Sequence, residues 1–148
     1  MLPSKAEKLR ILFRNALRKG YLNNVELDPS RSNTVLAATE PDETFIVRVD
    51  SRNGPLYWFT DRRLLREDDR GSFEILRYEG VRKAHWMFKD LWPDRMKALR
   101  SPEEAEQLKA TYRDRIEIEL VDGSLLAIEG LSDAYSPTLR FFRSITRL

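Results

Sequence analysis

The chain has 148 residues, the usual size of one domain, and its composition excludes several classes of protein. Hydrophobic residues make up 41% of it, enough for a core, while 34% are charged, which requires a well-solvated surface. It contains no cysteine, which excludes disulfides, thiolate nucleophiles and cysteine-ligated metals. The net charge of +2 is too small to indicate nucleic-acid binding by itself.

The amino-terminal segment does not have the pattern of a signal peptide, because Arg10, Arg14 and Arg18 interrupt its apolar residues. No apolar run approaches the roughly 18 residues that a membrane-spanning helix needs. The lack of cysteine fits a reducing compartment. Together these features predict a soluble, cytoplasmic protein without a transmembrane segment.

Residues 1–20 are predicted to form a basic amphipathic helix. Ser4 and Glu7 have the spacing of a capping box, and Gly20 is placed to end the helix. The apolar residues recur at helical spacing: Leu9, Leu12, Phe13, Ala16 and Leu17. We expect this stripe to pack on the rest of the domain and to leave the basic side chains in solvent. The alternative is a helix that lies on a membrane surface.

Positive charge is concentrated at the two ends of the sequence. Residues 5–19 contain six basic residues and a single acid, Glu7. The last dozen residues contain Arg140, Arg143 and Arg147 and no acid. This distribution is typical of the solvated faces of terminal helices. The alternative is a patch that binds acidic lipid, nucleic acid or an acidic protein.

Short strands separated by turn signals predict an antiparallel meander in the middle of the chain. β-Branched and aromatic residues mark strands at 44–50, 56–60, 63–67, 72–78 and 81–89, with a further short strand at 34–39. The turn signals include Asn53-Gly54, Asp61-Arg62 and Asp68–Gly71. Residues 57–59 are consecutive aromatics, so Trp58 and its two neighbours must point to opposite faces of their strand.

A helical insertion and a hairpin follow. The insertion is predicted within 90–113, where Pro93 opens a first segment and Ser101-Pro102 starts the next. Residues 115–120 alternate strictly, which places Ile116, Ile118 and Leu120 toward the core and the two glutamates between them toward solvent. Asp122-Gly123 predicts a two-residue type I′ turn, and residues 124–129 form the returning strand.

The chain ends in a predicted helix. Ser136 is the expected cap and Pro137 the expected first residue. Leu139, Phe142 and Ile145 contribute to its wide apolar face. We therefore expect the helix to close the core, with Phe142 buried against the sheet.

The order of these elements, together with one short motif, resembles the bacterial pleckstrin-homology-like domains. The motif is a strand that ends in Thr60-Asp61 and is followed by Arg62, Arg63 and Leu64, and the resemblance covers residues 44–148. It implies an α+β, mainly β fold: a bent antiparallel barrel or sandwich with a C-terminal capping helix. The N-terminal helix and the helical insertion would be additions to this fold within a single domain of residues 1–148.

The resemblance implies a non-catalytic binding module for a protein or an acidic membrane surface. Some eukaryotic members of the family bind phosphoinositides through basic residues between the first two strands, which correspond here to residues 48–54. This segment contains only two arginines and one acid. The predicted ligand-binding residues are Arg48 and Arg52 with Arg62 and Arg63 of the motif. The alternative is a small nucleic-acid-binding domain that uses basic helices and strand aromatics.

No pattern in the sequence indicates an enzyme. His85, the single histidine, has no visible catalytic partner. Glu117 and Glu119 alternate on the outer face of a strand, and Asp68 and Asp69 lie in a charged turn without a third metal ligand. Glycine-rich phosphate-binding and hydrolase motifs are absent from the sequence. We predict no catalytic, metal or cofactor site, and the sequence leaves the oligomeric state open.

Overall fold

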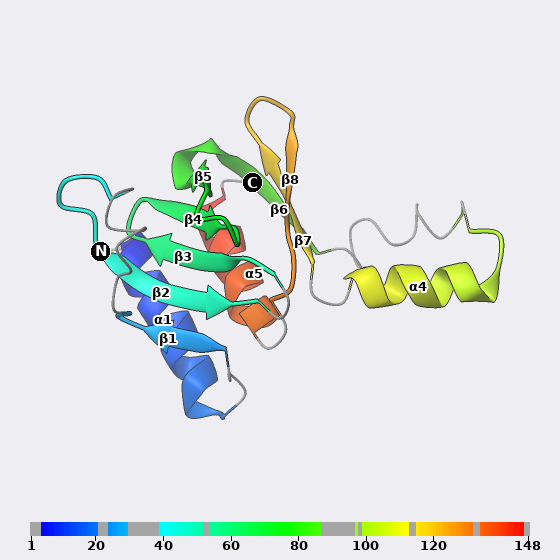
Figure 1. The fold of residues 1–148 in the computed structure, drawn as a ribbon, viewed down its shortest axis with the longest axis horizontal. Coiled ribbons are helices and arrows are strands. Elements are labelled where there is room, and N and C mark those ends of the chain that lie inside the picture. The colour runs from blue at the N-terminus through cyan, green and yellow to red at the C-terminus, as the bar shows by residue number, and fades with distance from the viewer. Residues whose placement is uncertain are drawn as a thin grey trace.

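The computed structural model describes residues 4–20, 24–29, 39–51, 54–86, 97, 99–112, 115–131 and 134–146. These residues form an α+β fold that is mostly β (Figure 1). The larger antiparallel sheet has the order β1 (Val25–Leu27), β2 (Phe45–Asp50), β3 (Leu56–Thr60), β4 (Arg63–Glu67) and β5 (Phe73–Arg77). The smaller has the order β6 (Val81–Trp86), β7 (Ile116–Leu120) and β8 (Leu125–Ile128). The α-helices are α1 (Lys5–Arg18), α4 (Pro102–Tyr112) and α5 (Tyr135–Ile145).

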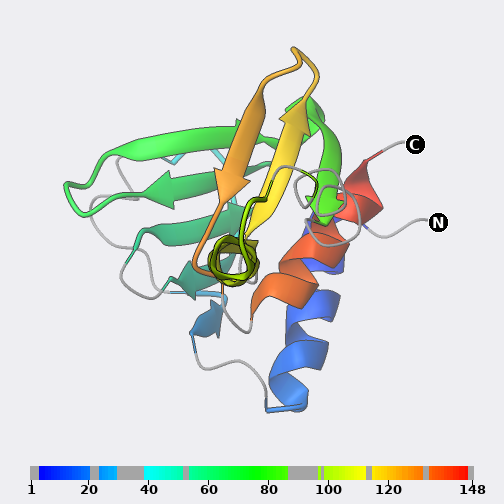
Figure 2. The ribbon, with the colours of Figure 1, turned by 90° about the vertical axis from the view of Figure 1, so that its right-hand side faces the viewer.

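Helices α1 and α5 cover one face of the larger sheet, and α4 extends away from the sheets (Figures 1 and 2). A 3-10 turn at Tyr78–Gly80 carries the chain from the larger sheet to the smaller one. Within the described residues no strand pairing joins the two sheets. The predicted antiparallel meander is therefore confirmed for β2 to β5, whereas β6 belongs to the second sheet, and the described strands do not close into a barrel.

Helix α1 packs on the domain as its apolar stripe predicts. The Ser4 hydroxyl accepts a hydrogen bond from the Glu7 amide at 3.2 Å, which caps the helix. Gly20 follows the helix with a positive φ of 77°, a conformation that glycine adopts without strain. Leu9 and Phe13 are fully buried, and the Phe13 ring lies 5.8 Å from that of Phe59. Burial of these side chains excludes the alternative in which the stripe itself contacts a membrane.

Helix α5 closes the same core but begins earlier than predicted. Its first residue is Tyr135, and the preceding Ala134 has no side-chain cap, so the prediction that Ser136 caps the helix is wrong. The turn starts earlier because the Ala134 amide already donates to the Leu131 carbonyl at 2.9 Å. Pro137 is tolerated because it lies in the first turn, where amides have no helical partner. Phe142 is fully buried, as predicted.

The three consecutive aromatics of β3 are all buried, on both faces of the sheet. Tyr57 and Phe59 belong to the main core under the helices. Trp58 points to the opposite face and packs with Phe45 and Leu65 in a smaller cluster. Its indole nitrogen donates to a carboxylate oxygen of Glu67 at 2.9 Å. Since only 1% of Trp58 is exposed, β3 presents no aromatic surface for a ligand.

The β7–β8 hairpin confirms the register of the alternating segment and corrects two details. Ile116 and Ile118 are fully buried, and Leu120 is partly buried. Glu117, however, is only 4% exposed, so the prediction that both glutamates are solvated is wrong for this residue. Strand β7 is the central strand of its sheet, and Glu117 is flanked there by His85 of β6 and Ala127 of β8.

The hairpin turn has a three-residue loop instead of the predicted two-residue type I′ loop. Asp122 lacks the positive φ that a type I′ turn requires, whereas Gly123 has a φ of 88°. The Gly123 amide donates to the Leu120 carbonyl, and the Leu120 amide donates to the Ser124 carbonyl, both at 2.9 Å. The Asp122 carboxylate also accepts the Ser124 amide, which stabilises this turn.

The remaining elements differ from prediction mainly at short segments. Strand β1 was not predicted, since three residues are too few to show an alternating pattern. The Ser101 hydroxyl accepts the Glu104 amide at 3.2 Å and thereby caps α4, as predicted. The predicted strand at 34–39 lies almost entirely outside the described residues, as do Asn53 and the helical segment predicted to begin at Pro93.

Candidate functional site

The first predicted ligand-binding residue, Arg48, is engaged within the protein. Its guanidinium lies 2.9 Å from a carboxylate oxygen of Glu26 and 3.7 Å from one of Asp50. The same group lies over the Trp58 ring, 5.8 Å from its centre. Arg48 therefore links β1, β2 and β3 on the face away from the helices. Arg52 lies outside the described residues.

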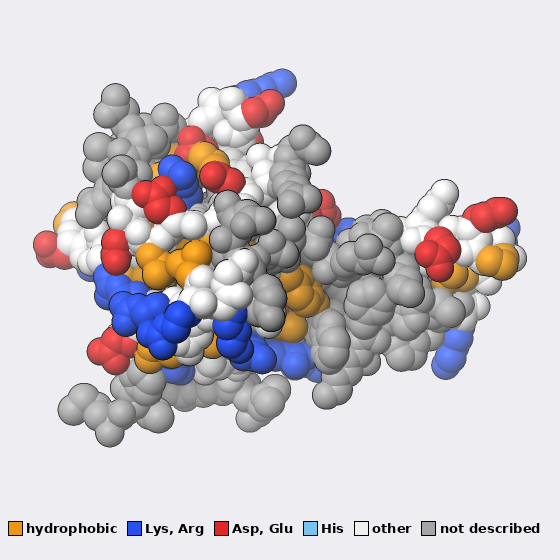
Figure 3. All heavy atoms as spheres, turned by 90° about the horizontal axis from the view of Figure 1, so that it is seen from below, with side chains coloured by type: hydrophobic (Ala, Val, Ile, Leu, Met, Phe, Trp, Pro, Cys, Tyr) orange, Lys and Arg blue, Asp and Glu red, His pale blue; other side chains and the backbone are white. Residues whose placement is uncertain are grey.

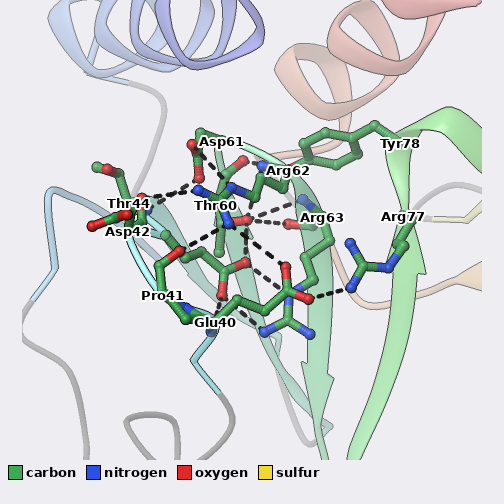
Figure 4. Close-up of polar contacts among 11 residues, drawn as sticks. Glu40, Pro41, Asp42, Thr44, Thr60, Asp61, Arg62, Arg63, Arg77 and Tyr78 are labelled. Atoms are coloured by element: carbon green, nitrogen blue, oxygen red, sulfur yellow. Dashed lines mark hydrogen bonds and ion pairs between the residues drawn. The ribbon is translucent and has the colours of Figure 1, made fainter.

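The two arginines of the motif lie together next to the turn that precedes β2 (Figure 4). Arg62 donates to the main-chain carbonyls of Pro41 at 2.9 Å and Asp42 at 3.2 Å. Arg63 forms a bidentate pair with Glu43, with nitrogen–oxygen distances of 2.7 and 2.8 Å. Arg63 and Glu43 are 3% and 4% exposed. The pair thus has almost no surface with which to contact a ligand.

Further hydrogen bonds complete this buried network. The Thr60 hydroxyl lies 2.8 Å from a carboxylate oxygen of Glu43 and accepts the amides of Arg62 and Arg63. The Tyr78 hydroxyl donates to the Thr60 carbonyl at 2.8 Å. These contacts join the turn before β2 to β3, β4 and the 3-10 turn, which gives the network a structural role.

The charges of the network stabilise one another. Burial alone would raise the pKa of Glu43, but the hydrogen bonds from Arg63, the Glu40 amide and Thr60, with the positive charge of Arg63, lower it to about 2. The same hydrogen bonds from Arg63 to Glu43 raise the pKa of Arg63. Both groups therefore stay ionised at neutral pH.

A groove lies between the β2–β3 and β4–β5 turns, where the family resemblance implies an anion site. It is lined by Ser51, Gly54, Pro55, Arg66, Asp68 and Asp69. A carboxylate oxygen of Asp68 accepts the main-chain amides of Arg70 and Ser72, both at 2.9 Å, as expected of the predicted charged turn. Among the described lining residues, two carboxylates thus face this groove with one guanidinium.

A different basic surface arises where α1 and α5 lie side by side. The Lys8 ammonium donates to the Ser144 carbonyl at 3.2 Å and so connects the two helices. The two helices contain one acidic residue, Glu7. Besides Lys5 at the start of α1, four exposed basic residues of the two helices have no partner among the described residues: Arg14, Arg18, Lys19 and Arg140. We call these four residues the helix-face cations.

Two of the helix-face cations, Lys19 and Arg140, line a groove between α1 and α5, and the other two lie beside one exposed apolar side chain of α1. The groove is lined by the apolar Leu12, Ala16 and Pro137 and the polar Asn15, Lys19, Ser136 and Arg140. Ile11 precedes Arg14 and Arg18 by three and seven residues, so it lies on their side of α1, and it is 49% exposed. Seen from below, Lys and Arg side chains gather in a band across the molecule (Figure 3).

The sequence identified both groups of basic residues but could not show that they meet. Charge at the two ends of a chain does not define which helices become neighbours. The structure supplies this, because Phe59 contacts Phe13 of α1 at 5.8 Å and Phe142 of α5 at 6.1 Å between ring centres. The shared core position of Phe59 brings the two basic segments to one face.

His85 lies on β6, directly opposite Glu117 of β7. It is partly exposed, and its Nδ1 is buried without a hydrogen-bond partner. In the part of the chain that the structure describes, no three His, Asp or Glu residues are grouped so that they could hold a metal ion. None of the described helices is long and apolar enough to cross a bilayer.

Comparison of the chain with protein-family models, curated proteins and solved structures finds no match. Function is therefore inferred from the chemistry of the described residues. The helix-face cations are exposed and have no acidic partner among the described residues, whereas Arg48, Arg62 and Arg63 are engaged within the protein.

Proposed function

We propose that this protein is a non-catalytic binding module that attaches to an acidic membrane surface through the face formed by α1 and α5. The observation that carries the proposal is the meeting of two basic segments, from opposite ends of the chain, on a face where α1 also exposes an isoleucine. The helix-face cations contribute four positive charges there without a described acidic partner. Basic residues near an anionic membrane contribute about 1 kcal/mol each.

Ile11 favours a membrane over other acidic partners. A basic helix face with an exposed apolar side chain suits the boundary between lipid headgroups and acyl chains, where both kinds of group are accommodated. The predicted alternative, nucleic-acid binding through basic helices and strand aromatics, would use exposed aromatics on which bases stack. The large exposed hydrophobic residues in the described part of the chain are all aliphatic, and Trp58 is buried. This favours lipid.

The proposal includes a pleckstrin-homology-like core. Its support is the order of the elements: β2 to β5 form consecutive antiparallel neighbours, β6 to β8 form a second sheet, and α5 follows. Helices α1 and α4 and strand β1 would be additions to that core. The proposed binding face differs from the one that the resemblance implies, because the turns at that position contain Asp68 and Asp69.

Co-sedimentation with vesicles tests the proposal. The full chain should bind vesicles that contain phosphatidylserine and not vesicles of phosphatidylcholine alone. Replacing all four helix-face cations by serine should weaken binding at least tenfold, because several contributions of about 1 kcal/mol are lost together. The matched control replaces four other exposed basic residues by serine: Arg70, Arg82, Lys97 and Arg100. This control should bind within about twofold of the wild type.

Measurements at high salt and with other acidic partners distinguish binding through this face from the alternatives. Raising the ionic strength to about 0.5 M should release the protein, because screening shortens the range of the charges. Equal losses in the two variants would show that net charge, and not this face, determines binding. Binding to RNA or to an acidic protein, without binding to the acidic vesicles, would contradict the membrane assignment.

A further inference from the structure

Strand β5 is the last strand of the larger sheet, and its outer edge has no partner strand among the described residues. Hydrogen bonds at both ends of the β4–β5 pair define which groups face outward. The Asp68 amide donates to the Ser72 carbonyl at 2.9 Å, and the Tyr78 amide donates to the Arg62 carbonyl at 3.2 Å. The main-chain N–H and C=O groups of the even-numbered residues of β5 therefore form the hydrogen bonds with β4. The main-chain groups of Phe73, Ile75 and Arg77 therefore point away from β4.

The side chain at the middle of this edge is apolar and exposed. Ile75 is 50% exposed, although its cross-strand neighbour Leu65 is fully buried. Phe73 is partly buried against the cluster around Trp58. An edge strand with unpaired main-chain groups and exposed apolar side chains is a template for pairing with another strand.

We propose that β5 pairs antiparallel with β5 of a second copy of this chain, about a twofold axis at Ile75. In this arrangement Ile75 lies opposite Ile75 of the second copy, and Phe73 lies opposite Arg77 of the second copy. These outward-facing residues become the hydrogen-bonded pairs, with about six main-chain hydrogen bonds in total. The two five-stranded sheets join into one continuous sheet.

The charges on β5 disfavour a shift of this pairing toward the β4–β5 turn. Shifting the pairs by one position toward the β4–β5 turn keeps the outward groups paired but places Glu74 opposite Glu74 of the second copy, and like charges directly opposite are destabilising. Centred on Ile75, the pairing places Glu74 opposite Leu76 and Arg77 opposite Phe73. This register therefore places no like charges directly opposite each other, and the Arg77 guanidinium already pairs with Glu40.

The expected dimer is weak and has a defined geometry. One pair of five-residue strands buries much less than the roughly 1,200 Å² of a stable interface, so the dimer should form only at high concentration. A twofold axis perpendicular to the sheet keeps both helix layers on the same side. If the proposed function is correct, the dimer would therefore present two sets of helix-face cations to one surface.

Single cysteines test the pairing directly, because the chain contains none. Directly opposite residues of a hydrogen-bonded pair have Cα atoms about 5.5 Å apart, within the range that a disulfide spans. We expect Ile75→Cys to form disulfide-linked dimers under mild oxidation at least tenfold more than Ile11→Cys. Ile11 is a matched control because it is 49% exposed and lies on α1.

Analytical ultracentrifugation of the cysteine-free chain provides the second readout. The wild type should show a mass that rises with concentration, and Ile75→Lys, a change at an exposed edge position, should remain monomeric. A monomeric wild type at about millimolar concentration would overturn the proposal. So would equal cross-linking of the two cysteine variants, or a dimer that persists in Ile75→Lys. None of these outcomes bears on vesicle binding by the monomer.

Discussion

Replacing Arg63 by methionine is expected to lower the free energy of unfolding by about 3–5 kcal/mol. The substitution leaves the Glu43 carboxylate, which is 4% exposed, without its bidentate partner. An unpaired charge in the interior costs far more than the loss of a surface ion pair. Urea denaturation of the two proteins measures the difference.

Arg62→Met is the matched control for this prediction. The Arg62 side chain is 38% exposed and neighbours Arg63 in the sequence. Its loss should therefore lower the free energy of unfolding by less than about 1 kcal/mol. The double variant Glu43→Leu with Arg63→Met should recover part of the stability, because it removes both buried charges. If Arg63→Met cost no more than Arg62→Met, the pair would not stabilise the fold.

The same pair makes stability depend on pH in a defined direction. The pKa of Glu43 is about 2 in the folded protein, against an ordinary value of 4.5. A lowered folded pKa stabilises the protein above pH 4.5, and this contribution is lost as the pH falls toward 2. The difference between these two pKa values corresponds to about 3 kcal/mol in the free energy of unfolding. Denaturation across this range should show a smaller loss in Glu43→Gln than in the wild type, and an equal loss would contradict the assignment.

Replacing Phe142 by alanine should also lower the free energy of unfolding by about 3–5 kcal/mol. Its ring is fully buried and lies 6.1 Å from that of Phe59 and 6.3 Å from that of Tyr78. The substitution removes the aromatic contacts and leaves a cavity where α5 meets the larger sheet. Arg140→Ala, an exposed change on the same helix, should alter stability by less than about 0.5 kcal/mol. A loss under about 1 kcal/mol for Phe142→Ala would mean that α5 does not close the core.

Periodicity in the sequence predicted most of the elements and much of the core. The stripe with Leu9 and Phe13 and the alternation at Ile116 and Ile118 each define a buried face without reference to the rest of the chain. These patterns are local, because helical and strand periods depend only on the spacing of apolar residues. They could not show that Glu117 is buried, which depends on its place in a central strand.

The candidate site could be predicted only in part, because its residues come from distant segments. Glu43 and Arg63 are twenty residues apart, and a glutamate in a turn is ordinarily solvated. The sequence pattern therefore gave no sign of the buried pair and left Arg63 among the ligand-binding candidates. The basic residues of α1 and α5 were recognised as two separate patches. Their meeting depends on how both helices pack against Phe59.

A fluorescent label at the proposed contact tests the central claim most directly. An environment-sensitive probe attached to Ile11→Cys reports entry into lipid, and the same probe on Leu125→Cys of β8 is the control, since Leu125 is also well exposed. On addition of phosphatidylserine vesicles, emission from the Ile11 position should shift to the blue and increase, while emission from the Leu125 position should not change. Binding of both labelled proteins to the vesicles without a change at Ile11, or with an equal change at Leu125, would contradict attachment through the α1–α5 face.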